Sequence, residues 1–134
     1  MTVWLRSGEV TGEPALVNRI LLVVKGSPQK DGKVAEGFRL ATAMIAMDVL
    51  PQILFVEDGV FWLVKKQLPE SESRESINER LKTISDLVGL HVLSDSLAQR
   101  KLKPNDLDEG YNARKLSLDE AAELVAQNDA VITF

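Results

Sequence analysis

Two adjacent carboxylates, Glu57 and Asp58, follow directly after an apolar run at residues 52–56. Neighbouring carboxylates can act as general acid and general base, or they can bind a cation. Consecutive residues at the end of a strand tend to point to opposite faces, which weakens a paired role. The alternative is a plain turn, in which Gly59 supplies an unusual backbone angle.

A second polar pair, Ser94 and Asp95, follows the apolar stretch at residues 89–93. These side chains could line a pocket at the end of a strand. Alternatively, either could be an N-cap that accepts backbone N–H bonds at the start of a helix. His91 lies inside the apolar stretch, where a hydrogen-bonded structural imidazole is favoured over a catalytic one. The spacing along the chain assembles no serine, histidine and acid set, so no nucleophilic triad is predicted.

The loop from Gly26 to Lys33 has the position of a phosphate-binding loop, because it follows an apolar run and precedes a helical pattern. Five residues separate Gly26 from Gly32, where the motif has four, and Val34 replaces the hydroxyl residue that binds magnesium. We therefore expect no nucleotide hydrolysis at this loop. Weak anion binding near Ser27, at the helix N-terminus, is the alternative to an ordinary solvated loop.

Strand and helix patterns alternate along most of the chain. Unbroken runs of leucine and β-branched residues predict buried strands, and apolar side chains at helical spacing predict helices. The predicted strands are 19–24, 52–56, 89–93, 111–116 and 130–134, and the predicted helices are 33–48, 60–67, 76–86, 94–102 and 117–128. Ser117 and Glu120 have capping-box spacing at the start of the last helix, and residues 104–110 are expected to form a loop.

This alternation predicts an α/β fold, a doubly wound and mainly parallel sheet of about five strands with helices on both faces. A chain of 134 residues fits one domain, which we place at residues 19–134. Residues 1–18 show no clean period and are expected to form an extra strand or an arm docked through Trp4. Ligands of such folds bind beyond the carboxyl ends of the strands. The candidate pocket residues are therefore Ser27, Glu57, Asp58, Ser94 and Asp95.

Five consecutive apolar residues, at positions 60–64, lie on one of the predicted helices. A helix that buries one face does not need five in a row, so part of this surface should meet a second element or another chain. Phe61 and Trp62 are the candidate oligomer-interface residues, because aromatic side chains dominate interface energetics. The alternative is a helix wedged inside the monomer.

Composition narrows the possible chemistry. The chain has no cysteine and one histidine, which excludes a disulfide and a thiolate metal site and does not favour a zinc cluster. A net charge of −4 does not favour nucleic-acid binding. The longest apolar run is much shorter than a membrane span, and the N-terminus lacks a signal-peptide pattern. We expect a cytoplasmic protein without a metal or a cofactor.

Three stretches resemble the DsrE/DsrF-like sulfur-relay family, most closely its TusC/DsrF-type subunit. They are FVEDGVF at residues 55–61, VLSDSL at residues 92–97 continuing to Arg100, and NDAVITF at residues 128–134. Together with the run at 19–24, the resemblance spans residues 19–134 and implies the flavodoxin-like layout of that family. It also implies cytosolic proteins that pass persulfide sulfur towards tRNA thiolation or in sulfur oxidation, and that form trimers or hexamers.

The sulfur-carrying members of that family have a cysteine just after the third strand, where a helix N-terminus stabilises the thiolate. This chain has Val92, Leu93 and Ser94 in that neighbourhood, and a serine hydroxyl forms no persulfide. We therefore expect a non-catalytic subunit that assembles with itself or with cysteine-bearing DsrE-type relatives. The alternatives are a module that binds a small anion or nucleotide at the strand ends, and an enzyme that uses Glu57, Asp58 or His91.

Overall fold

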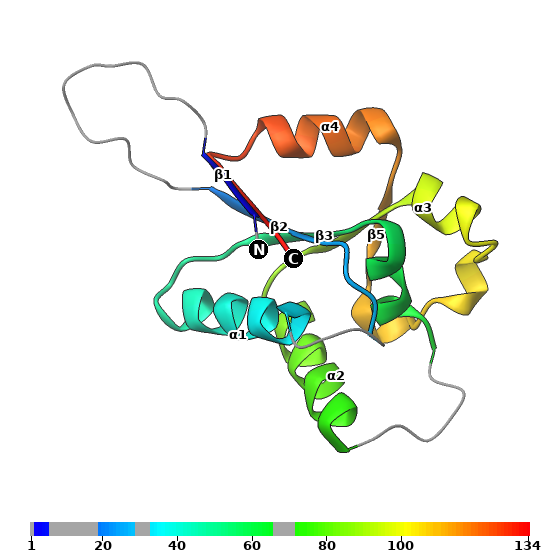
Figure 1. The fold of residues 1–134 in the computed structure, drawn as a ribbon, viewed down its shortest axis with the longest axis horizontal. Helices are drawn as coiled ribbons and strands as arrows, with labels where there is room; N and C mark the ends of the chain where they lie inside the picture. The colour runs from blue at the N-terminus through cyan, green and yellow to red at the C-terminus, as the bar shows by residue number, and fades with distance from the viewer. Residues whose placement is uncertain (1, 6–18, 29–32, 66–71) are drawn as a thin grey trace.

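Six strands form one sheet in the computed structural model, which describes residues 2–5, 19–28, 33–65 and 72–134 (Figure 1). The strands are β1 (Thr2–Leu5), β2 (Ile20–Val24), β3 (Gln52–Phe55), β4 (Leu90–Leu93), β5 (Arg114–Leu116) and β6 (Ala130–Thr133). The α-helices are α1 (Lys33–Ala46), α2 (Glu72–Ser85), α3 (Ser94–Gln99) and α4 (Leu118–Ala126). Three 3₁₀ segments complete the list: η1 (Glu57–Leu63), η2 (Pro104–Asp106) and η3 (Glu109–Tyr111).

The strand order is β1-β6-β2-β3-β4-β5, and all neighbours pair in parallel except β1, which pairs antiparallel with β6. The prediction of a mainly parallel α/β sheet is therefore confirmed. The sheet has one strand more than expected because Thr2–Leu5 adds to the edge of β6. The rest of the predicted N-terminal segment, residues 6–18, lies outside the described residues.

Helices cover both faces of the sheet (Figure 1). Helices α1 and α2 pack on one face, where the larger apolar cluster contains Phe38 of α1, Leu81 of α2 and Phe55 of β3. Helix α4 packs on the opposite face through Leu124, which joins a smaller cluster with Leu54 of β3. No helix in the described ranges is long and apolar enough to span a bilayer.

Several element boundaries differ from the sequence prediction. Helix α2 begins at Glu72, four residues before the expected start, and β5 begins at Arg114, three residues after its expected start. The helix expected at 60–67 is a 3₁₀ segment that already begins at Glu57 and ends at Leu63, and its expected last two residues lie outside the described ranges. Helix α3 ends at Gln99, three residues before the predicted end. The stretch expected as a loop at 104–110 contains η2 and the start of η3.

The capping box at α4 is confirmed. The Glu120 N–H donates to the Ser117 hydroxyl oxygen at 3.2 Å, and the Ser117 N–H donates to the Glu120 carboxylate at 3.1 Å. The hydrogen bond from the Ser117 N–H to the carboxylate lowers the pKa of Glu120. The two bonds satisfy backbone donors that the helix itself leaves unpaired.

We expect Ser117→Ala to lower the free energy of unfolding by about 0.5–2 kcal/mol, because the Glu120 N–H loses its acceptor. Urea unfolding followed by circular dichroism measures this loss. Ser117→Asp is the matched control, since aspartate also caps well and should retain most of the stability. An unchanged midpoint for Ser117→Ala would show that the cap contributes nothing.

Candidate functional site

The carboxyl ends of β3 and β4 lie side by side, because the two strands pair in parallel with Phe55 opposite Val92. The segment η1 follows β3 and α3 follows β4, so both begin at this edge of the sheet. The Glu57 N–H donates to the hydroxyl oxygen of Ser96 at 2.9 Å. Ser96 is buried at 3% exposure, so this bond fixes the start of η1 against α3.

Asp58 is held in an ion pair and is not free to act with Glu57. Its carboxylate accepts from Arg100 Nε at 3.0 Å, while Arg100 Nη1 donates to the Ser96 carbonyl at 3.2 Å. The Glu57 side chain is exposed. One carboxylate is thus charge-paired and its neighbour is solvated, so the geometry does not build an acid–base pair. Sequence reasoning missed Ser96 and Arg100, although their spacing of four residues on α3 places them on one face.

The unusual backbone angle in this turn belongs to Glu57, whose φ is 50°, and the prediction that Gly59 supplies it is wrong. Gly59 is required for a different reason. A Cβ at this position would overlap the carbonyl oxygen of Val24 and would lie 2.7 Å from its carbonyl carbon. The same Val24 oxygen accepts from the Val56 N–H at 3.0 Å. The turn after β3 therefore packs directly on the backbone at the end of β2.

The other predicted pocket residues are not linked to this pair. Helix α3 begins at Ser94, and Leu93 holds the N-cap position without a side-chain hydrogen bond. The alternative that Ser94 or Asp95 caps the helix is therefore wrong. Ser27 is half-buried, and no hydrogen bond among the described residues joins it to Glu57 or Ser94. The strand-end contacts that the structure does form run through Ser96 and Arg100.

The aromatic pair on η1 is divided between the core and the surface. Trp62 is 4% exposed, and its Nε1 donates to the Gly26 carbonyl at 2.8 Å. Its ring packs edge-on against Phe38, with 5.2 Å between the ring centroids. The prediction of Trp62 as an interface residue needs correction, because this side chain is part of the monomer core. Phe61 is 40% exposed. In a 3₁₀ segment side chains three apart eclipse, so Val60 and Leu63 share a buried face that excludes Phe61.

His91 lies between Leu54 and Arg114 on adjacent strands of the sheet. Both ring nitrogens are buried and have no hydrogen-bond partner among the described residues. The expectation of a hydrogen-bonded structural histidine is therefore wrong. Burial lowers the pKa of His91, and the positive charge of Arg114 lowers it further. The neutral imidazole is therefore favoured over the charged imidazolium at this position.

We expect stability to fall as the pH drops through the range just below the ordinary His91 pKa of 6.5. In that range the unfolded chain binds more protons than the folded one, so the free energy of unfolding rises with pH. His91→Leu should flatten the profile between about pH 7 and pH 5, since the substituted side chain does not titrate. Urea unfolding at several pH values measures both profiles, and parallel curves for the two proteins would contradict this account.

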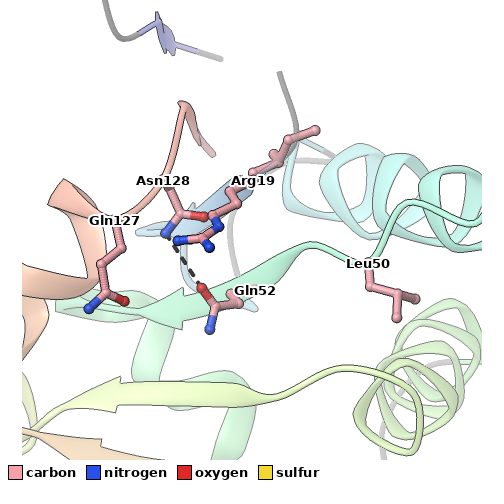
Figure 2. A pocket seen from close by; sticks show the side chains of 6 residues that line it. Arg19, Leu50, Gln52, Gln127 and Asn128 are labelled. Atoms are coloured by element: carbon pink, nitrogen blue, oxygen red, sulfur yellow. Dashed lines mark hydrogen bonds between the residues drawn. The ribbon is translucent and has the colours of Figure 1, made fainter. Parts of the chain in front are cut away.

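A polar hollow of about 260 Å³ lies at the other end of the strands, away from the carboxyl ends (Figure 2). Asn128, buried at 1% exposure, donates from Nδ2 to the Leu124 carbonyl at 2.6 Å and to Gln52 Oε1 at 3.5 Å. The hollow is lined by Arg19, Ile20, Leu50, Gln52, Gln127 and Asn128. Because Gln52 begins β3, this hollow is at the amino ends of the strands and contains none of the predicted pocket residues.

Comparison with known proteins places these features in a family. The DsrE/DsrF-like family matches residues 18–134. A protein TusC homolog of Aliivibrio fischeri is 28% identical over 120 residues, covering 88% of this chain and all of that protein. The matched region begins after β1, which therefore lies outside it.

Two solved structures share the fold. The ychN protein from E. coli superposes with a TM-score of 0.69 at 22% identity, covering 87% of this chain and 99% of that one. The protein MTH1491 from Methanobacterium thermoautotrophicum has a TM-score of 0.62 at 18% identity, covering 87% and 98%. At these identities the likeness concerns the fold, and it agrees with the α/β architecture described above.

Proposed function

Because this chain belongs to the DsrE/DsrF-like family, we propose that it is a non-catalytic, oligomer-forming subunit associated with sulfur relay, in tRNA thiolation or in sulfur oxidation. The observation that carries the proposal is the absence of cysteine from all 134 residues. Leu93 ends β4 and Ser94 begins α3, and the sulfur-carrying proteins that this chain resembles have their cysteine in this neighbourhood. A serine hydroxyl stays protonated at neutral pH and forms no persulfide.

The proposed partners are further copies of this chain or cysteine-bearing DsrE-type relatives, in a cytoplasmic trimer or hexamer. Phe61 supports an assembly role, because it is an exposed aromatic side chain on a segment that the core holds firmly. Its neighbour Trp62 is buried and hydrogen-bonded to the Gly26 carbonyl, and the adjoining turn packs on Val24. Rigid aromatic side chains of this kind often dominate the energy of an interface.

The strand-end alternative, binding of a small anion or nucleotide, has less support. Arg100 reaches the carboxyl ends of β3 and β4, and Asp58 already neutralises it at 3.0 Å. Glu57 and Asp95 are exposed and add negative charge to the same edge. Like charges repel an anionic ligand, so this edge gives it little attraction.

The chain should not accept sulfur from a cysteine desulfurase. We expect no protein-bound label after incubation of the wild-type chain with a desulfurase and ³⁵S-cysteine, because no thiol is present to form a persulfide. The matched control is Ser94→Cys, which restores a single thiol after β4. Label that survives on the wild-type chain under non-reducing conditions, and leaves on reduction, would exclude the proposed role.

Assembly with relatives is tested by co-expression with a cysteine-bearing DsrE-type protein from the same genome. We expect a mixed oligomer whose mass, measured by light scattering, exceeds that of either protein alone. A chain that stays monomeric both alone and in the mixture would contradict the proposed subunit role.

A further inference from the structure

Strand β1 is one edge of the sheet (Figure 1). Its last three residues are apolar, and successive side chains of a strand point to opposite faces. Val3, Trp4 and Leu5 are 50%, 49% and 60% exposed. The opposite edge is different, because β5 exposes Arg114 and Lys115. Charged side chains on an edge strand disfavour its pairing with a strand of another molecule. The sequence TVWL of β1 has no charged side chain, so charge does not protect this edge against pairing.

Strand β1 also lies outside the region that matches the family, which begins at residue 18. It pairs with β6 along all four of its residues, from Thr2 opposite Thr133 to Leu5 opposite Ala130. Without β1, β6 would be the edge of the described sheet. Strand β1 therefore gives this chain an apolar edge strand outside the family-matched region, and pairing through β1 does not depend on the proposed sulfur-relay role.

We infer that β1 pairs antiparallel with β1 of a second copy of this chain. A two-fold axis perpendicular to the sheet keeps each face on the same side in both copies. Side chains directly opposite in an antiparallel pair share a face, so only positions of equal parity can meet. The register that centres on Trp4 sets Trp4 against Trp4 of the second copy on one face. On the other face it sets Val3 against Leu5 and Leu5 against Val3. Each exposed apolar side chain then gains a cross-strand partner.

Strand β1 of a second copy fits this edge better than β5 of a second copy does. Two neutral β1 strands bring no like charges together, and their two-fold contact closes. Pairing of β1 with β5 of the next copy would set apolar side chains near Arg114 and Lys115, and it would propagate without closing. The apolar area covered is on the order of 300 Å² per copy, less than the roughly 800 Å² of a standard interface. The contact is therefore weak by itself and reversible.

The absence of cysteine makes the register directly testable. In Trp4→Cys the two thiols face each other across the axis, where opposed Cα atoms are about 4.5–5.5 Å apart and a disulfide can form. We expect mild oxidation to give a covalent dimer roughly tenfold faster than in Leu118→Cys, because pairing raises the effective thiol concentration. Leu118 is the matched control, an apolar side chain that is 61% exposed on α4.

A second pair of variants keeps Trp4 in place. Val3→Cys mixed with Leu5→Cys should cross-link faster than either variant alone, since the register sets position 3 against position 5. If Trp4→Cys and this mixture both link no faster than the control, β1 pairing is overturned. Cross-linking of Trp4→Cys that persists in a Phe61→Glu background would show that the β1 contact is separate from the proposed η1 interface, and loss of the link in that background would overturn its independence.

Discussion

Gly59→Ala should lower the free energy of unfolding by about 3 kcal/mol, because overpacking against a fixed backbone cannot be relieved by a change of rotamer. The added Cβ would overlap the carbonyl oxygen of Val24, and that carbonyl is itself fixed by the Val56 N–H. Either β2 or the turn after β3 must then move. Gly59 and Phe61 both belong to η1, so the position of Phe61 should be disturbed together with the stability.

Urea unfolding followed by tryptophan fluorescence measures this effect, since Trp62 packs on Phe38 directly beside the affected turn. Gly89→Ala is the matched control. A Cβ at Gly89 would meet its nearest neighbour, Nε2 of His91, at 3.5 Å, which is an ordinary contact. We expect the control to change stability by less than about 0.5 kcal/mol. Equal losses of unfolding free energy in the two variants would mean that a Cβ at position 59 does not clash with Val24.

The order of strands and helices could be predicted from the sequence because it depends on local patterns. The run that became β2 is buried whichever neighbours it has, and the cap at Ser117 needs only Glu120 three residues later. Strand β1 could not be settled in the same way. Its four residues show neither the alternation of polar and apolar residues typical of a strand nor helical spacing. They form a strand because they pair with β6.

The strand-end contacts could be predicted only in part, because they join residues far apart in the chain. Asp58 and Arg100 are separated by 42 positions, and only the parallel pairing of β3 with β4 brings them together. The positive φ of Glu57 and the close approach of Gly59 likewise depend on where β2 ends. The apolar run at 60–64 was interpreted with α-helical spacing. In its 3₁₀ geometry Val60 and Leu63 share one buried face, Trp62 is also buried, and Phe61 is exposed.

Phe61→Glu should shift the proposed oligomer towards smaller species while the helical signal of the protein is retained. A carboxylate buried at an interface without a partner loses hydration and costs several kcal/mol. A loss of about 3 kcal/mol weakens association by roughly a hundredfold. The monomer should tolerate the change, because Phe61 is 40% exposed and its neighbours in the core stay in place. Trp62→Glu should behave differently and unfold the chain, since the charge would enter the core beside Phe38.

The decisive measurement is the mass by light scattering at matched protein concentrations, with circular dichroism to report folding. Leu87→Glu is the control, because Leu87 is an apolar side chain of comparable exposure, at 54%, in the turn after α2. If Leu87→Glu retains the wild-type mass and Phe61→Glu does not, the effect belongs to the η1 surface and not to added charge in general. A wild-type monomer, or an oligomer that both substitutions leave intact, would remove Phe61 from the interface.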